Sequence, residues 1–456
     1  MRRLFPYAVG MCCAVTLLIG CDAVRFSGGG FAQELTVEVA VFEGGYGVHW
    51  HLGIARRYEE EMAALGRPLR VNLWGDPRLS EKIKPRILRG DPPDLVLMHN
   101  LPIWLLIAAG KILSFDDVLD QPALDAASPW RDLFLPGMLS MYQADGKTFA
   151  IPSAIQAWAC WYDARLFRRH GWKPPATWAE FVALCDRIQA AGIAPMAFQG
   201  KYPGYAWFTF ISLVQRCGGL AAINRINLME DGAFSHPDVV WAASLLQDMA
   251  RSYFQRGAMA MTHTESQLQF VNNQAALIFC GLWLHNEMKA STPPGFEMRC
   301  FTVPAVDGGK GNPRLVNGAG SEFLFVPTDA RRPEEGFAFA RYMVSLRNAP
   351  GMGRAIGVLS PLHGGTPRET VDPPLQSAMD MIDQAEAFFY ERTSELLPEW
   401  MNQVVQPNLA ALLRGELAPE VYCAALERGM AEAKKNPDLI IPEYTPFEPT
   451  RFGETS

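Results

Sequence analysis

Residues 35–110 alternate between two hydrophobic periodicities, and this alternation limits the possible folds more than any other feature of the sequence. Residues 35–42 alternate apolar and polar side chains, as a half-buried strand does. Residues 52–65 repeat apolar side chains every three or four positions, as an amphipathic helix does, and the pattern ends at Gly66. The same order of strand and helix predicts a parallel sheet flanked by helices. It continues through segments at 69–73, 80–88, 95–98 and 102–109.

The N-terminal segment predicts export and a lipid anchor. Two arginines precede an apolar stretch that is short for a membrane span. That stretch ends in Leu-Ile-Gly-Cys21, the pattern of a bacterial lipobox, in which the Cys21 thiol becomes lipidated. We therefore expect residues 1–21 to be a lipoprotein signal with its anchoring cysteine, and residues 22–33 to be a flexible tether. An ordinary signal peptide cleaved after Ala32 is the alternative, and both mean export.

The composition fits a globular protein of two or three domains. The chain has 456 residues, of which 49% are hydrophobic and 20% are charged, so it can bury sizeable cores. Its net charge of -7 argues against nucleic acid or an anionic membrane surface as the main partner.

Six cysteines follow the leader, and their wide spacing gives no Cys-x-x-Cys pair and no metal-ligand pattern. We expect most of them to be buried thiols. Export permits disulfides, for example between Cys280 and Cys300, but the pairing does not follow from the sequence. The six are Cys160, Cys185, Cys217, Cys280, Cys300 and Cys423.

Six short motifs follow one another in the chain and together carry a family resemblance. They are GDPPDLV from Gly90, AGKIL from Ala109, GKTFAIP from Gly146, WYDARLF from Trp161, GWKPPATWAEF from Gly171 and AALIFCGLW from Ala275. In this order they resemble the extracellular sugar-binding proteins of ABC transporters, the family that includes maltose-binding protein. Asp163 stands where that family usually has Asn.

The resemblance implies an α/β protein with the two-lobed, periplasmic-binding-protein-like fold of type II. Each lobe would be a mostly parallel sheet flanked by helices, with hinge strands between the lobes. Residues 34–152 plus 303–347 would form lobe 1, residues 153–302 plus 348–440 lobe 2, and residues 441–456 a tail.

The resemblance also implies a function. The chain would be the extracytoplasmic substrate-binding component of an ABC importer, which captures a carbohydrate or similar polyhydroxy solute by hinge closure and delivers it to the permease. We expect a monomer in the periplasm or at the cell surface that is held to the membrane by its lipid, catalyses no reaction and needs no cofactor or metal.

A sugar is bound by aromatic rings against its C–H face and by planar polar groups at its hydroxyl edge. Candidates are polar or aromatic side chains that follow predicted strands, where loops meet in an α/β protein, or that match family positions. Trp283, in the Gly-x-Trp motif, is the strongest of them, although core packing would also explain this ring and Trp400. The candidates are Glu43, Tyr46, Trp74, Asp76, His99, Asn100, Gln156, Trp158, Trp207, Trp283, Glu322 and Trp400.

Two other classes of function stay open. An exported carbohydrate-active enzyme would need a pair of carboxylates, for which Glu43, Asp76 and Glu322 are available, but no nucleophile motif is present. A metal-binding receptor would need three or four ligands, and the candidates are His49, His51 and His99. Within the binders, a polyamine would require extra carboxylates in the cleft and a phosphorylated sugar an arginine cluster, and neither is evident from the sequence.

Overall fold

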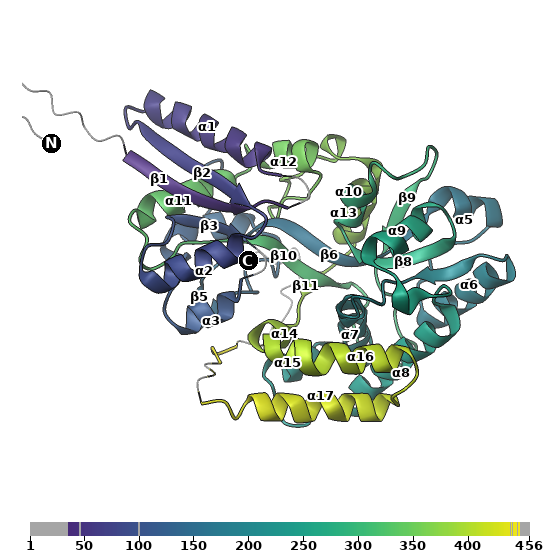
Figure 1. Cartoon of the computed structure of the whole chain (residues 1–456). Coiled ribbons are helices and arrows are strands. Elements are labelled where there is room, and N and C mark those ends of the chain that lie inside the picture. The colour runs from purple at the N-terminus through teal and green to yellow at the C-terminus, as the bar shows by residue number, and fades with distance from the viewer. Residues whose placement is uncertain are drawn as a thin grey trace, which may run out of the picture.

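The computed structural model describes residues 35–44, 47–98, 101–437, 439, 441–444 and 446 of the chain. Cys21 and the predicted tether lie outside these residues, and so do the site candidates Tyr46, His99 and Asn100. Figure 1 shows two lobes, with two long strands running through the middle of the molecule.

The first lobe begins with the predicted alternation of strands and helices. Strands β1 (Leu35–Phe42), β2 (Leu69–Asp76) and β3 (Leu95–Met98) are parallel, with β1 in the middle. Helices α1 (His49–Ala64) and α2 (Leu79–Arg89) connect them. Each strand buries Val, Leu or Ala side chains in the core, which is why the two periodicities in the sequence produce this layered arrangement.

Two long strands, β6 (Ile151–Asp163) and β10 (Leu315–Phe325), join the two lobes. They pair with each other in antiparallel fashion, and the end of β10 also pairs with β3. The far half of β6 pairs with β8 (Ala275–Gly281), which in turn pairs with the parallel strand β7 (Ala194–Ala197). The sheet order is therefore β2-β1-β3-β10-β6-β8-β7, one path through both lobes (Figure 1).

The second lobe is mostly helical around β6, β8 and β7. Its helix α6 (Trp178–Ala190) begins with the predicted capping box, because Thr177 Oγ1 accepts from the Glu180 amide at 3.3 Å while Glu180 Oε2 accepts from the Thr177 amide at 3.4 Å. Helix α7 (Gly204–Asn227) is the one described helix long and apolar enough to cross a bilayer. Most of its apolar window is buried inside the protein, so it is a core helix here.

Helices from the last quarter of the chain complete the second lobe. In Figure 1, α16 (Gln406–Leu413) and α17 (Pro419–Ala433) lie side by side beneath it, and both contact α8 (Pro237–Tyr253). The other helices and strands are α3 (Ile103–Ala108), α4 (Asp116–Leu119), β4 (Gln143–Ala144), β5 (Lys147–Thr148), α5 (Ala164–His170), α9 (His263–Val271), α10 (Leu284–Met288), β9 (Met298–Phe301), α11 (Pro333–Met343), α12 (Ala349–Ile356), α13 (Pro373–Asp383), β11 (Ala387–Phe389), α14 (Thr393–Leu396) and α15 (Pro398–Trp400).

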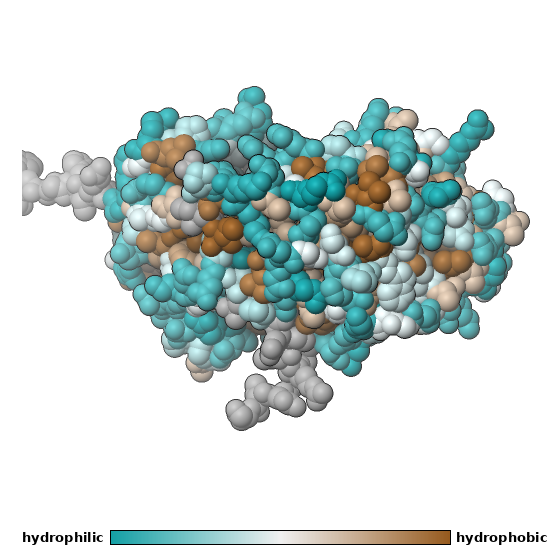
Figure 2. Space-filling model, turned by 90° about the horizontal axis from the view of Figure 1, so that it is seen from below, coloured by the Kyte–Doolittle hydropathy of each residue, from teal (hydrophilic) through white to brown (hydrophobic). Residues whose placement is uncertain are grey.

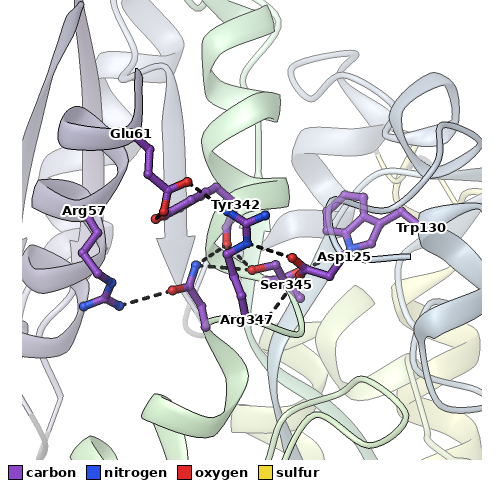
Figure 3. Close-up of polar contacts among 9 residues, drawn as sticks. Arg57, Glu61, Asp125, Trp130, Tyr342, Ser345 and Arg347 are labelled. Atoms are coloured by element: carbon purple, nitrogen blue, oxygen red, sulfur yellow. Dashed lines mark hydrogen bonds and ion pairs between the residues drawn. The ribbon is translucent and has the colours of Figure 1, made fainter. Parts of the chain in front are cut away.

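A polar network fixes the turn that follows α11 (Figure 3). The Tyr342 hydroxyl donates to Glu61 Oε1 at 2.7 Å, and Arg347 donates to Glu61 Oε2 at 2.9 Å and to Asp125 Oδ1 at 2.7 Å. Trp130 Nε1 donates to the Val344 carbonyl at 3.0 Å. The network therefore ties α1 and the 125–130 loop to the segment where the chain leaves α11.

The cysteines of the described chain are all buried free thiols, as the spacing predicts for most of them. Burial raises the pKa of Cys217 and Cys300 to about 12, so these thiols stay protonated at neutral pH. The face in Figure 2 is covered mainly by hydrophilic residues, and its apolar residues form separate patches.

Candidate functional site

A cavity of about 300 Å³ lies where β6 and β10 pair, a volume at the lower end of the range for small-molecule sites. The two strands form one wall, and α7 and Trp283, the second residue after β8, form another. The loop near residue 141, and residues 390–395 up to and including part of α14, complete it. The lining residues are Met141, Tyr142, Gln156, Ala157, Trp158, Trp207, Phe208, Ile211, Trp283, Asn317, Gly318, Gly320, Ser321, Phe323, Tyr390, Glu391, Ser394 and Glu395.

Aromatic rings form the apolar side of the cavity. Trp158, on β6, stacks on Phe208 of α7 with ring centroids 5.0 Å apart and 28° between the planes. Trp283 lies next to Trp158, with centroids 6.2 Å apart. Trp158 Nε1 donates to Thr209 Oγ1 at 2.9 Å, which fixes the orientation of its ring. The structure thus brings together Trp158, Trp207 and Trp283, three tryptophans that the sequence predicts as ligand contacts.

The Gly-x-Trp motif has a steric explanation. The ring of Trp283 folds back over Gly281, the last residue of β8, and a Cβ atom at position 281 would lie 1.9 Å from Cζ3 of that ring. Real Cβ atoms essentially never approach another atom so closely. Glycine at 281 is therefore required for the ring of Trp283 to reach the cavity.

Two carboxyl groups line the polar side of the cavity, and the sequence did not single them out. Glu391 Oε2 accepts from Trp207 Nε1 at 2.9 Å, and Glu395 Oε2 accepts from the Tyr142 hydroxyl at 2.7 Å. Burial raises the pKa of Glu395 to about 7, with a further rise from the nearby Glu391, and burial also raises the pKa of Glu391. Both groups therefore lie in a setting that favours their neutral form.

Gln156 connects this cavity to a smaller one of about 120 Å³. Gln156 and Trp283 line both, and Asn286 and Glu287 line only the smaller one. The Oε1 atom of Gln156 is buried and has no hydrogen-bond partner among the described residues. An unpaired buried carbonyl is costly, so Gln156 is suited to accept a hydrogen bond from a bound molecule.

Other predicted residues lie away from the cavity. Trp400 is 3% exposed, donates from Nε1 to the Leu426 carbonyl at 3.1 Å and packs edge-on against Trp207, so it fills the core. Trp74 donates from Nε1 to Glu38 at 3.0 Å, and Asp76 pairs with Lys82. A molecule in the cavity would not touch these side chains in this conformation.

Two predicted glutamates do not line the cavity. Glu43 follows the end of β1, and Glu322 is on β10. Glu43 is half-buried beside the end of β2, where its amide donates to the Asp76 carbonyl at 3.3 Å. Glu322 lies between two lining residues of β10 but is 7% exposed and has a φ of 52°, a conformation that costs energy for a residue other than glycine. Burial raises the pKa of its carboxyl group to about 8.

The predicted metal ligands do not come together within the described residues. His49 is exposed at the start of α1, whereas His51 is 1% exposed and burial lowers its pKa to about 4. In the part of the chain that the structure describes, no three His, Cys, Asp or Glu side chains are grouped as metal ligands.

Comparison with known proteins decides the family. The family model for bacterial extracellular solute-binding proteins matches residues 66–349, which is more than half of the chain. The chain belongs to this family. Solute-binding proteins of this kind are receptors of ABC-type import systems, so the predicted family and the predicted class of function are confirmed. Its relatives are receptors and not enzymes.

Curated relatives of this solute-binding protein bind sugars. The diacetylchitobiose binding protein NgcE of Streptomyces coelicolor is 25% identical over 324 residues, which cover 70% of this chain and 68% of the relative. The multiple sugar-binding protein of Streptococcus mutans is 24% identical over 294 residues, or 61% of this chain and 65% of the relative. Other relatives are described as periplasmic sugar-binding proteins, which supports export.

Solved structures confirm the two-lobed fold. A chitin oligosaccharide binding protein superposes with a TM-score of 0.71 at 19% identity, covering 88% of this solute-binding protein and 99% of the solved chain. The sugar-binding protein MalE from Xanthomonas citri gives a TM-score of 0.71 at 16% identity, with 87% and 97% covered. The predicted type II fold is therefore confirmed.

Proposed function

We propose that this solute-binding protein captures a carbohydrate, or a similar polyhydroxy solute, in the cavity beside β6 and β10 and delivers it to an ABC permease. One observation carries the proposal: the indole rings of Trp158 and Trp283 and the unpaired carbonyl of Gln156 line one cavity. The rings suit the apolar C–H face of a sugar ring, and the carbonyl suits a hydroxyl at its edge. The sugars named for the relatives support this class of ligand.

The position of the cavity supports hinge closure as the binding mechanism. Its lining residues come from the two strands that join the lobes, β6 and β10, and from α7, α14 and the loop near residue 141. A ligand that contacts all of them stabilises the closed arrangement of the lobes by its differential affinity for that state. The closed form would then dock on the permease.

We further propose that no chemical step takes place on this chain. The enzyme alternative based on Glu43, Asp76 and Glu322 has little support, since none of these side chains lines the cavity. Incubation with the bound sugar should return it unchanged by chromatography, and release of a shortened product would contradict this part of the proposal.

The proposal includes the predicted anchor and domain division. The protein would be a monomeric lipoprotein, held at the periplasmic or cell surface through Cys21. Lobe 1 would comprise residues 34–152 plus 303–347 and lobe 2 residues 153–302 plus 348–440. Incorporation of a labelled fatty acid that a Cys21→Ser variant loses would support the anchor, and cleavage after Ala32 would contradict it.

The test is a thermal-shift panel over mono- and oligosaccharides, polyols, polyamines and divalent metals. We expect a concentration-dependent rise in the unfolding midpoint with a saccharide. The Trp283→Ala variant should lose that rise. A matched control, Trp241→Ala, removes a partly buried indole of α8 outside the cavity and should keep it. A response to metals alone, which a His49→Ala variant loses, would favour the metal receptor instead.

A further inference from the structure

Several hydrogen-bond donors in the walls of the cavity are already used within the protein. Trp158 Nε1 and Trp207 Nε1 are both used inside the wall, on Thr209 and Glu391. The Asn317 amide donates to the Phe208 carbonyl at 2.8 Å and to Ser212 Oγ at 3.0 Å. These donors are not available to a ligand.

The tyrosine hydroxyls are used in the same way. Tyr142 donates to Glu395, and the Tyr390 hydroxyl contacts the carbonyl oxygens of Ser140 and Met141 at 2.8 Å each. The donating hydrogens of both tyrosines therefore point into the protein wall.

Acceptors remain on the same surface. Within the described residues, Glu395 Oε1 accepts no hydrogen bond, and only its Oε2 is bonded, to Tyr142. Gln156 Oε1 is likewise unpaired. Glu391 accepts from the Ser394 amide at Oε1 and from Trp207 at Oε2, and the side chains of Thr393 and Ser394 also bond to it, so Glu395 is the freer of the two carboxyl groups. A complementary ligand would therefore be rich in donors.

The charge of the lining points the same way. Two glutamates line the cavity, and among its described lining residues there is no Lys, Arg or His. Arg392 follows Glu391 directly in the sequence, but its side chain is only 1% exposed. It lies between the rings of Trp104 and Tyr444. It donates to the backbone carbonyls of Asn227 and Pro442. It therefore belongs to the wall behind the cavity and offers no donor to a ligand.

We propose, on the basis of the function proposed above, that the ligand is a saccharide with a protonated amine, and that Glu391 and Glu395 select it. An ammonium group supplies three donors and one positive charge, which match the free acceptors and the two carboxyl groups. The indole rings that line the same cavity add cation–π attraction. Acidic and phosphorylated sugars match this site less well, since the described lining residues include no Lys, Arg or His to pair with them.

The titration of the two glutamates agrees with this assignment. Their pKa values are raised because burial disfavours the charged form, and a bound cation would favour it. Binding of an amine should therefore release a proton from the protein near neutral pH. A neutral sugar should release none from these groups.

The experiment compares two disaccharides that differ only in acetylation: diacetylchitobiose, which is neutral, and its deacetylated form, which carries amines. Calorimetry at pH 7 in two buffers of different ionisation enthalpy gives the affinity and the protons released. We expect the amine form to bind at least about tenfold more tightly, the size of one charge-assisted hydrogen bond. It should also be the one that releases protons.

Variants then locate the selectivity. Glu395→Gln keeps an acceptor for Tyr142 but removes the charge, so the ratio of the affinities for the amine form and the neutral form should fall about tenfold. Glu399→Gln removes an exposed carboxylate of α15 outside the cavity and should change neither. If Glu395→Gln fails to fold, the disaccharide pair on the unaltered protein still decides the question.

The outcomes separate the two proposals. Equal or tighter binding of the neutral form, without proton release, would overturn the selection of an amine and leave a carbohydrate receptor. Absence of binding by any saccharide in the thermal-shift panel would overturn the proposed function itself. Binding of linear polyamines in preference to every amino sugar would also overturn the assignment, because the ligand would then not be a saccharide.

Discussion

The substitution Gly281→Ala tests how the cavity is built. Gly281 is paired with Trp158 across β6 and β8, and the ring of Trp283 lies directly over it. Alanine is compatible with the strand backbone at this position, so the substitution requires only space for one additional methyl group. That group would lie 1.9 Å from Cζ3 of Trp283.

The size of the effect follows from this overlap. A carbon–carbon contact needs about 3.5–4.0 Å, so the indole must move by roughly 1.5–2 Å. Overpacking of this kind costs about 1–3 kcal/mol in the free energy of unfolding. A displaced ring also loses its stacking on a ligand, worth about 0.5–1.5 kcal/mol, and the affinity should therefore fall roughly 2- to 12-fold.

Calorimetry with the saccharide that gives the largest thermal shift measures the affinity, and tryptophan fluorescence reports the displaced ring. The control is Gly53→Ala in α1, where the new Cβ would have only the Arg57 guanidinium within 4 Å, at 3.7 Å. Removing a glycine from a helix should stabilise the protein by about 0.5–1 kcal/mol and leave binding unchanged. Wild-type affinity and fluorescence in Gly281→Ala would refute the assignment of Trp283 to the binding surface.

Two further predictions concern stability. The pKa of Glu322 is raised to about 8, so the folded state holds a proton that the unfolded state loses above about pH 4.5, and stability falls as the pH rises through this window. Glu322→Gln should therefore stabilise the protein by about 4–5 kcal/mol at pH 8.5 and by less than about 1 kcal/mol at pH 5. An equal shift of the thermal midpoint at both pH values would contradict this. Thr177→Ala removes the cap of α6 and should cost about 1 kcal/mol without changing ligand affinity, since α6 does not line the cavity; a change in affinity would contradict this.

Local patterns were sufficient to predict the order of strands and helices at the start of the first lobe. The change of period between residues 35 and 110 corresponds to β1, α1, β2, α2 and β3, because strands with two buried faces and helices with one apolar stripe leave distinct signatures. The capping box at Thr177 was equally readable, since the bonds that define it lie within four residues. The family motifs supplied the two-lobed arrangement, which depends on pairings between β6 and β10 more than 150 residues apart in the sequence.

The site was predicted only in part. Four of the predicted residues line the cavity: Gln156, Trp158, Trp207 and Trp283. Family motifs or predicted strand ends indicated them. Trp400 matched a family position as well, but its burial depends on packing against α17, which no local pattern reveals. Glu391 and Glu395 were missed because the strand before them, β11, has only three residues. Had that strand been recognised, the rule of polar residues after strands would have pointed to Glu391.

The two central strands connect recognition to movement. Gln156 and Trp158 lie on β6 close to where its partner changes from β10 to β8. Ser321 and Phe323 lie on β10 close to where it meets β3. Any rotation of one lobe against the other must bend β6 and β10 near these positions, so it must also move the side chains that line the cavity. A ligand that contacts the side chains of both strands would favour one bent conformation of β6 and β10 over the others. If the lobes close as proposed, we expect the strands that hold them together also to transmit occupancy of the cavity to the outer surface.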